Sequence, residues 1–490
     1  MDVRVLRQRP VIAALLIGAL IIQIEINVVG TAMPDISAEL KDFSLYPWVF
    51  AGYLVAYTAF VPLSGMLNDT FGRKATYLLS MALIAGGTMF CGMATSMQML
   101  IVGRLIQGCG AGSIFVTTQT ILGDLFTTER RARVQSAVNL VGALGATSGP
   151  ALGGWFVTHA TWRWAFFITF PVVIVTCTLF LIGFVDSTKR GTRAMNWRGA
   201  LLLTLILVGL LVGIGKGNVN VWLLAGAGAL AIPFFLFERR AARPVLPPDL
   251  FLNPAFRISA LTLFLLGAIQ VSYIVFLPIY LQGVVGLPPS TSGYLQAVPL
   301  TLAVTASTFF VGTFIKRHGY RLMVRVGALC AVVLTLASAA AAWEYARDHS
   351  AVATILLVVQ QALIGICMGF AMTGALICVQ NQVRQASRGT ATASVHLIRG
   401  IGSVLAPALL GYLLLAAMRD QHLSIAPEKF FDQKALPQLL GVDAAAVASA
   451  RAGLARALQS LFPILIGISG LAFVSSLLFP KAVVDVDAKS

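Results

Sequence analysis

Charged residues are scarce in this chain of 490 residues. They make up 11% of the sequence, and 58% of the residues are hydrophobic, whereas soluble domains carry about 25% charged residues. A chain with so few charges lacks the polar surface that a water-soluble globule needs. We therefore expect lipid, rather than water, to surround most of the protein.

Two chemical signatures are also missing. The six cysteines lie in or beside apolar runs and form no C-x-x-C pair, which argues against a disulfide framework or a zinc site. The sequence contains no G-x-x-x-x-G-K-[ST] pattern and no ATPase domain, so ATP hydrolysis is excluded as the energy source. No soluble catalytic domain is evident either. We expect neither an enzyme nor a bound metal or organic cofactor.

The first apolar run, which follows several arginines, is not a convincing cleavable signal peptide. It leads into Glu25 and Pro34 without a small-residue cleavage site. We interpret it as the first membrane span.

The net charge of +16 has a topological explanation. The basic residues form short clusters between long apolar runs, which is the pattern of membrane topology signals and not of a nucleic-acid-binding stripe. We expect no nucleic-acid partner.

Apolar runs of about 20 residues, the length that crosses a bilayer, recur along the whole chain. About fourteen are present. They are Val11–Val29, Trp48–Leu67, Ala75–Met93, Gln98–Leu122, Val134–Val157, Trp164–Val185, Trp197–Ile214, Val221–Phe237, Ile258–Tyr280, Gly293–Ile315, Leu322–Trp343, Val352–Val379, Thr390–Met418 and Leu461–Phe479. The sequence thus predicts an all-α polytopic membrane protein.

Lysine and arginine concentrate in alternate loops, which by the positive-inside rule are the cytoplasmic ones. This pattern predicts that both chain termini are cytoplasmic and that the protein lies in a bacterial-type cytoplasmic (inner) membrane. A longer outer loop at about 419–460 contains an Ala-rich stretch that forms either a short amphipathic helix or a mobile loop.

The two parts of the chain repeat one another. A shift of about 257 positions places Arg131 on Arg388, and the same shift matches a glycine- and proline-rich stretch in each part. Six spans therefore resemble six later ones, which predicts two parallel-related halves around a central cavity. We divide the chain into an N-terminal half (1–186), two inserted spans with flanking cytoplasmic loops (187–255) and a C-terminal half (256–490).

Four motifs carry a family resemblance that covers nearly the whole chain. They are GMLNDTFGRK from Gly65, RLIQGCGAG from Arg104, GATSGPALGG from Gly145 and WRWAFFITF from Trp162. Their order and their places in the topology resemble the major facilitator superfamily, and more narrowly its fourteen-span drug:H⁺ antiporter family.

The loop after the second span is similar to the signature loop of the superfamily. The resemblance implies a cytoplasmic latch that holds the outward-facing state, and a generic charged turn is the alternative. The latch residues are Gly65, Asp69, Gly72, Arg73 and Lys74, with Arg133. We expect the glycines to allow close approach or positive φ, and Asp69 to pair with Arg133 or Arg73.

The fifth span resembles the motif of antiporters, which symporters of the superfamily generally lack. The resemblance implies export, whereas ordinary helix packing by glycine is the alternative. The motif residues are Gly145, Gly149, Pro150, Gly153 and Gly154.

Four ionisable residues lie deep in spans, where charge is costly and function is the default hypothesis. They are Glu25, Arg104, His396 and Arg399. Burial disfavours the ionised form of Glu25 and a nearby arginine favours it, so this residue can load and release a proton. We expect Arg399 to be its partner, with Arg104 as the alternative. A purely structural Glu–Arg pair remains open, and so does a core role for His396.

Polar and aromatic residues on the spans that face the expected cavity are candidates for substrate contact. They are Asn27, Tyr53, Tyr57, Gln107, Gln270, Tyr273 and Gln361. Packing roles remain open for each of them.

Proton-coupled export of small lipophilic or cationic compounds, driven by the proton gradient, is the function that these features favour. The alternatives are export of an endogenous lipid, glycolipid or siderophore, uptake by symport, and a sensor that transports nothing. We expect a monomer, and an accessory protein remains open.

Overall fold

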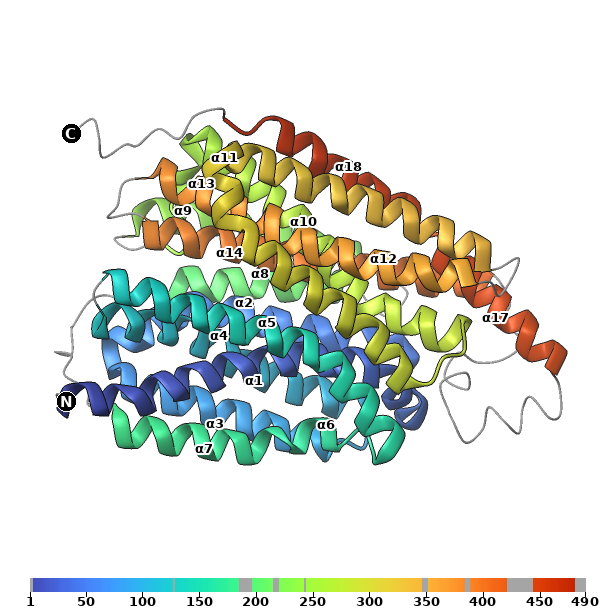
Figure 1. Ribbon diagram of the computed structural model, residues 1–490, viewed down its shortest axis with the longest axis horizontal. Helices are drawn as coiled ribbons and strands as arrows, with labels where there is room; N and C mark the ends of the chain where they lie inside the picture. The colour runs from blue at the N-terminus through green and yellow to red at the C-terminus, as the bar shows by residue number, and fades with distance from the viewer. Residues whose placement is uncertain are drawn as a thin grey trace.

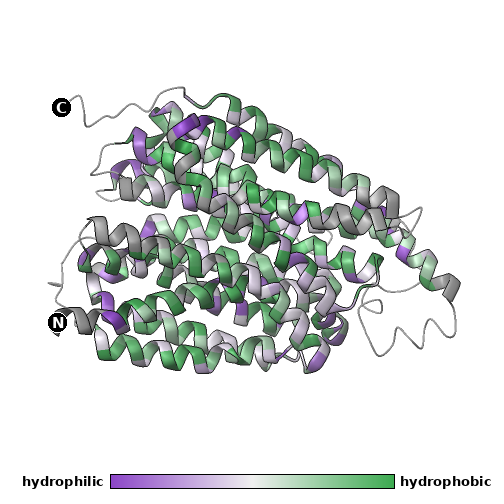
Figure 2. Ribbon diagram, in the orientation of Figure 1, coloured by the Kyte–Doolittle hydropathy of each residue, from purple (hydrophilic) through white to green (hydrophobic). Residues whose placement is uncertain are grey.

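The computed structural model is built from helices and describes residues 3–126, 128–184, 196–214, 220–241, 244–345, 351–383, 388–420 and 444–480. No strand occurs among these residues. A helix pairs its backbone N–H and C=O groups within its own segment, which allows an apolar chain to cross lipid. Hydrophobic residues dominate the lengths of the helices, and hydrophilic residues gather near their ends (Figure 2). The expected all-α polytopic fold is confirmed.

The N-terminal half, in the lower part of Figure 1, is a bundle of helices. They are α1 (Val3–Leu40), α2 (Tyr46–Phe71), α3 (Arg73–Gly92), α4 (Met97–Leu125), α5 (Thr128–His159), α6 (Trp164–Phe167) and α7 (Thr169–Gly183). Gly72, with a φ of 89°, separates α2 from α3, because glycine adopts positive φ without steric cost. The Ser96 side chain accepts a hydrogen bond from the Met99 amide and caps the start of α4.

The C-terminal half lies against it in the upper part of Figure 1. Its elements are η2 (Pro248–Leu252), α10 (Pro254–Pro278), η3 (Ile279–Val284), α11 (Pro289–Tyr345), α12 (Ala351–Cys367), η4 (Met368–Met372), α13 (Thr373–Gln382), α14 (Arg388–Asp420), α17 (Ala444–Gln459) and α18 (Phe462–Leu477). Non-helical backbone at Gly319 breaks α11 into two segments. These segments correspond to the predicted spans Gly293–Ile315 and Leu322–Trp343.

The inserted pair, α8 (Trp197–Ile214) and α9 (Val221–Arg240), packs beside the seam between the halves. Leu207 of α8 and Phe234 of α9 share one apolar cluster with Val55 of α2 and Val404 of α14. Trp222 on α9 is exposed, as expected for a side chain that faces lipid. The insertion therefore extends the bundle sideways and leaves the cores of both halves intact.

Twelve helices among the described residues are long and apolar enough to cross a membrane, and α8 is a shorter apolar helix. The segment of α11 before Gly319 is a further helix at a predicted span. The exact count of fourteen, and the division at 186/187 and 255/256, stay predictions. Residues 185–195 and most of the long outer loop, 421–443, lie outside the described residues. The rest of that loop contains α17, so the helix is the alternative that the structure supports.

The two halves contact each other near the end of the molecule that carries α17 (Figure 1). The Tyr46 hydroxyl donates to the Val275 carbonyl oxygen over 3.2 Å. The Gln282 side-chain amide donates to the Thr31 carbonyl oxygen over 2.9 Å. Helix α1 begins and α18 ends at the opposite end of the molecule (Figure 1), as an even number of crossings requires.

Candidate functional site

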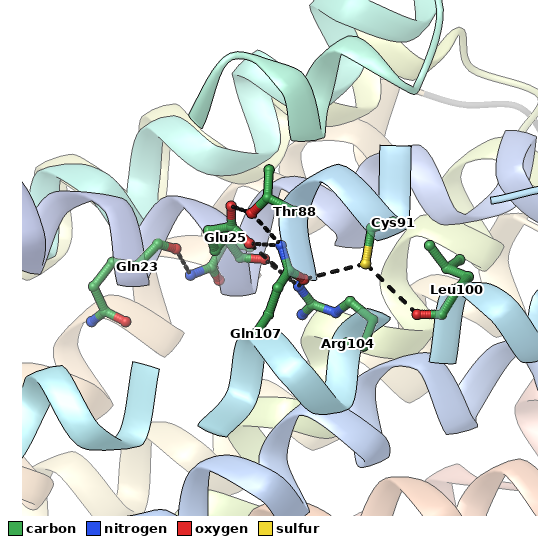
Figure 3. Close-up of polar contacts among 8 residues, drawn as sticks. Gln23, Glu25, Thr88, Cys91, Leu100, Arg104 and Gln107 are labelled. Atoms are coloured by element: carbon green, nitrogen blue, oxygen red, sulfur yellow. Dashed lines mark hydrogen bonds and ion pairs between the residues drawn. The ribbon is translucent and has the colours of Figure 1, made fainter. Parts of the chain in front are cut away.

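Glu25 lies in the core of the N-terminal half, where α1, α3 and α4 meet (Figure 3). Its exposed fraction is 3%. The Thr88 hydroxyl of α3 donates to its Oε1 atom over 3.0 Å, and the Gln107 side-chain amide of α4 donates to its Oε2 atom. The two carboxylate oxygens thus have separate donors on two different helices.

Arg104 is the ion partner of Glu25. Its exposed fraction is 1%, and its Nη1 atom lies 3.8 Å from Glu25 Oε2. The same nitrogen donates to the Glu25 backbone oxygen over 3.1 Å and to Gln107 Oε1 over 2.9 Å. The guanidinium carbon lies 4.2 Å from the ring centroid of Tyr53 on α2. A buried pair with this many partners ties four helices together.

Gln107 connects the two charges. Its oxygen accepts from Arg104, and its nitrogen donates to Glu25 and to the Thr88 hydroxyl at 2.8 Å. The close approach of α3 and α4 sets its position, because a Cβ atom on Gly87 would lie 2.7 Å from Gln107 Cγ. We predicted Gln107 as a cavity residue; the structure places it in the Glu25 network, and a role in substrate contact stays a prediction. Thr88, an uncharged residue in an apolar run, gave no sequence signal.

His396 and Arg399 lie on α14 of the other half. The His396 ring packs edge-on against Phe115 of α4, with 5.7 Å between the ring centroids. Arg399 Nη1 donates to Met372 Sδ over 3.6 Å. The expected Glu25–Arg399 pair is therefore not formed in the structure, and the alternative partner, Arg104, takes its place. The prediction assumed that residues at similar depth in the membrane meet, but at this level α14 contacts α2 and α4 and does not reach Glu25 on α1.

At the loop between α2 and α3, Arg73 makes the best-defined contacts. Its Nε atom lies 3.0 Å from Asp124 Oδ2 at the end of α4, and its Nη1 atom donates to the Asn68 backbone oxygen over 2.9 Å. Asp124 was not predicted from the sequence. The feature that could have identified it is its place as an acidic residue at the end of the span that carries Arg104.

The remaining latch residues divide into two groups. The side chains of Asp69 and Arg133 lie outside the described residues, so their pairing stays a prediction. Gly65 was expected to permit close approach, but apart from its chain neighbours and its own helix backbone, no atom that the structure describes lies within 4 Å of the place where its Cβ would be. Positive φ at Gly72 is the one glycine requirement that the structure shows in this loop.

The glycine motif on α5 joins α1 to the opposite half. A Cβ atom on Gly149 would lie 2.8 Å from Asn27 Cβ of α1, and one on Gly153 would overlap the Val28 carbonyl oxygen. On the other side of α5, a Cβ atom on Gly154 would overlap the Pro289 carbonyl oxygen at the start of α11. The motif therefore permits two backbone contacts at once. Gly145 and Pro150 extend the face toward α1: a Cβ on the first would lie 2.7 Å from the Leu20 oxygen, and the oxygen of the second accepts from Thr31 over 2.9 Å.

The other predicted cavity residues do not form one cluster. Tyr53 and Tyr57 stack on α2 with ring centroids 6.4 Å apart, and the Asn27 amide donates to the Gln23 backbone oxygen of its own helix. Tyr273 lies in the C-terminal half, where its hydroxyl donates to Ser338 over 2.8 Å. Gln361 is buried and its Nε2 atom has no partner among the described residues; Gln270, by contrast, does have an interaction partner. A role in substrate contact stays a prediction for all of them.

Two helical halves, glycine-lined contacts between them and a buried ion pair within one half define a membrane transporter, not an enzyme. Residues 15–407 match the model of the Major Facilitator Superfamily, and the chain belongs to this family.

Similar proteins include drug transporters. The chain is 28% identical over 413 residues to the multidrug transporter protein MdtP of Bacillus subtilis, which covers 83% of this chain and 75% of that protein. Multidrug resistance protein 3 of the same organism is 27% identical over 409 residues, 82% and 78% of the two chains. An uncharacterized MFS-type transporter of Mycobacterium tuberculosis is 30% identical over 420 residues, 84% of this chain but 60% of that protein. The expected kinship with multidrug-type members of the superfamily is confirmed.

Solved structures agree on the fold. A bacterial homolog of the human lysosomal transporter Spinster superimposes with a TM-score of 0.69 at 17% identity, over 98% of each chain. A D-xylose-proton symporter gives a TM-score of 0.64 at 12% identity, over 97% and 98% of the two chains. At these identities the likeness concerns the fold alone.

Proposed function

We propose that this chain, as a monomer in a bacterial cytoplasmic membrane with both termini inside, exports small lipophilic compounds in exchange for protons. The observation that carries the proposal is the buried Glu25 carboxylate, held by donors on two other helices and by one arginine. The named multidrug transporters among its relatives support the substrate class. The α5 motif, which resembles that of antiporters, supports the direction.

Proton binding would change this network in a defined way. An ionised carboxylate only accepts hydrogen bonds, whereas a protonated one must also donate one. Thr88 and Gln107 both donate to Glu25, so the new O–H needs an acceptor, which the Thr88 hydroxyl can become if its own proton rotates away. The positive charge of Arg104 then loses its counter-ion and keeps the Glu25 backbone oxygen, Gln107 Oε1 and the Tyr53 ring. Protonation would therefore shift the balance of contacts among α1, α3 and α4.

A short path leads from Glu25 to the contact between the halves. Two residues further along α1, Asn27 packs on Gly149 of α5. The Thr31 hydroxyl donates to the Pro150 oxygen, and its own backbone oxygen accepts from Gln282 of the other half. A displacement of α1 by protonation would act directly on contacts that must break for alternating access.

Glu25→Gln provides the test, in proteoliposomes that carry an imposed pH gradient and a panel of dyes and lipids. Glutamine keeps the size of the side chain but cannot exchange a proton, so we expect gradient-driven transport to fall to the level of empty liposomes. The matched control is Glu39→Gln on the same helix, because Glu39 pairs with Arg163 and its side chain is 49% exposed. This control should keep most of its transport. Full gradient-driven transport by folded Glu25→Gln would show that Glu25 does not couple transport to protons.

A further inference from the structure

Arg399 is a positive charge deep in a span that has no carboxylate partner among the described residues. Its Nη1 atom donates to Met372 Sδ over 3.6 Å, and this weak acceptor is the one hydrogen-bond partner of the side chain that the structure describes. Arg104, the other deep arginine, is held by Glu25 and Gln107. A guanidinium buried without a counter-ion is unfavourable, so the charge of Arg399 is available to an anion.

The C-terminal half contains no acidic residue that could supply this anion. Residues 250–343 and 349–419 include neither Asp nor Glu. Asp420, at the far end of α14, is roughly 30 Å away along the helix axis at about 1.5 Å per residue. In the other half, the Glu25 carboxylate is already paired with an arginine. A bound anion would therefore complete the surroundings of Arg399.

The fold makes a place for the Arg399 side chain. A Cβ atom on Gly267 of α10 would lie 2.8 Å from Arg399 Cγ, so a larger residue there would displace the arginine. Met372, which the guanidinium contacts, is the last residue of the π-helical segment η4. Single π-helical turns of this kind are frequent at functional sites. The arginine is thus positioned by two neighbouring elements.

The side of α14 that carries Arg399 faces the interior of the bundle. Leu397 and Val404 of this helix share an apolar cluster with the inserted pair. His396 instead packs against Phe115 of α4, and Arg399 against α10 and η4. Arg399, His396 and Phe115 are nevertheless only partly buried. The surface that they keep accessible therefore lies where the two halves meet, and a ligand can contact it there.

Aromatic rings accompany the charge. The Tyr57 ring of α2 lies 6.3 Å from the Phe115 ring, and the Phe115 ring lies 5.7 Å from the His396 ring. His396 precedes Arg399 by three residues, so the two share one face of α14. Rings favour flat apolar groups, and a guanidinium binds a carboxylate through its planar fork of N–H donors. Together they select an aromatic body that carries a negative group.

We propose that Arg399, Tyr57, Phe115 and His396 form a binding site for small aromatic carboxylates, with the carboxylate on the guanidinium and the aromatic body against the rings. The binding claim stands on this geometry. The further step, that such anions are exported, rests on the proposed function and narrows its substrates to lipophilic compounds with one negative charge.

The experiment measures binding of radiolabelled 4-chlorobenzoate by equilibrium dialysis against purified full-length protein in neutral detergent, at fixed pH and ionic strength. 4-Chlorobenzamide has nearly the same shape without the charge. Arg399→Gln removes the positive charge, Arg399→Lys keeps it without the planar fork, and Phe115→Leu removes a ring. The matched control is Arg163→Gln, which removes an arginine from the distant, partly exposed pair with Glu39.

The unmodified protein and Arg163→Gln should bind 4-chlorobenzoate equally. Arg399→Gln should bind it at least about tenfold more weakly, since hydrogen bonds between charged groups are lost. Arg399→Lys should fall between the two, and Phe115→Leu should lose several-fold. The amide should bind the unmodified protein at least about tenfold more weakly than the carboxylate, and Arg399→Gln should not change its affinity.

Equal affinity for the carboxylate and the amide would overturn the proposal, and so would undiminished 4-chlorobenzoate binding by folded Arg399→Gln. Displacement of the probe by chloride as effectively as by unlabelled 4-chlorobenzoate would overturn the aromatic part, because it would indicate a simple halide site. Thermal unfolding checks that each variant is folded. If Arg399→Gln is not, the comparison of the two ligands on the unmodified protein and on Arg399→Lys still decides.

Glu25→Gln separates this proposal from the proposed function. The variant should lose gradient-driven transport and keep its affinity for 4-chlorobenzoate, because Glu25 does not contact the Arg399 site. Loss of binding in folded Glu25→Gln would contradict a separate anion site. Retained binding with unimpaired transport would contradict only the coupling role of Glu25.

Discussion

The cores of the two halves share a fold but differ in charge. The N-terminal core contains a buried ion pair, and the matched positions of the C-terminal core are neutral. The shift that matches Gly65 and Gly72 with Gly312 and Gly319 also places Thr88 on Thr335. In the N-terminal half Thr88 donates to a buried carboxylate, whereas in the C-terminal half Thr335 shares a 2.8 Å hydrogen bond with the Ser469 hydroxyl.

The same divergence applies to the arginine. The longer shift of about 257 positions places Arg104 on Gln361, so the ion pair of one half corresponds to neutral side chains in the other. The N-terminal core is filled by a charged network, whereas the matched positions of the C-terminal core carry neutral side chains. The second half therefore keeps the helical packing at these positions without the cost of burying charge there.

The largest loss of stability is expected when the arginine of the N-terminal core is removed. Arg104→Ala leaves Glu25 buried without its counter-ion, which typically costs about 3–5 kcal/mol of stability. Gln361→Ala at the matched position removes no charge and should cost about 1–2 kcal/mol. Thermal unfolding of both purified variants measures the difference.

A double variant identifies the cause. Glu25→Gln combined with Arg104→Gln removes both charges, so it should recover most of the stability lost in Arg104→Ala. If Arg104→Ala and Gln361→Ala unfold at the same temperature, the buried pair has no special energetic role.

The α5 motif provides a second comparison, between a close backbone contact of α5 with α1 and an open position on α2. Gly153→Leu forces a side chain against the Val28 backbone oxygen of α1, and overpacking of this kind costs about 1–3 kcal/mol. Gly65→Ala on α2 meets open space and should change stability by less than about 0.5 kcal/mol. Unfolding temperatures and the fraction of each variant that inserts in the membrane would test both values. A stable, fully active Gly153→Leu protein would contradict the close α1–α5 contact.

The sequence predicted the fold well because membrane helices carry strong local signals. Apolar runs, basic loops and the repeat anticipated the positions of α1 to α5, although α1 extends beyond the expected Val11–Val29 at both ends, and Gly319 was recognisable as the equivalent of Gly72. It predicted the identity of the buried charges too, because Glu25 and Arg104 stand out in apolar runs.

Their partners were harder to predict. The depth of a residue gives its position along one helix but not the direction of its side chain around the helix axis, and this direction decides whether Arg104 or Arg399 meets Glu25. Thr88 and Asp124 became visible only through contacts between helices that lie far apart in the sequence.

A smaller effect is expected at the surface pair that joins the α2–α3 loop to α4. Asp124→Asn removes the charge partner of Arg73, and the Asp124 side chain is 40% exposed. Such partly exposed pairs contribute about 0–1 kcal/mol, so stability should hardly change. If the loop acts as a conformational latch, the transport rate should nevertheless fall several-fold while substrate affinity stays the same. Ser44→Ala is the control for a substitution away from this pair. If Asp124→Asn transports at the unmodified rate, the pair has no role in conformational exchange.

The smallest effect concerns the pH dependence of transport in Arg399→Ala. Arg399 lies on α14 and donates to Met372, while Glu25 has its own partner, Arg104, at 3.8 Å. Because the proposed proton site at Glu25 does not include Arg399, removal of Arg399 should leave the midpoint of the pH profile unchanged. The transport rate can still fall, since Arg399 lies on the helix that packs His396 against Phe115 of the other half.

Arg104→Lys is the matched comparison: an ammonium keeps the charge beside Glu25 but lacks the planar fork that reaches both Gln107 and the Glu25 backbone oxygen, so this variant should move the midpoint. Transport rates measured across a pH series for both variants test the assignment. If Arg399→Ala moves the midpoint and Arg104→Lys does not, then Glu25 exchanges partners during the cycle, and the pair seen here belongs to only one of its states.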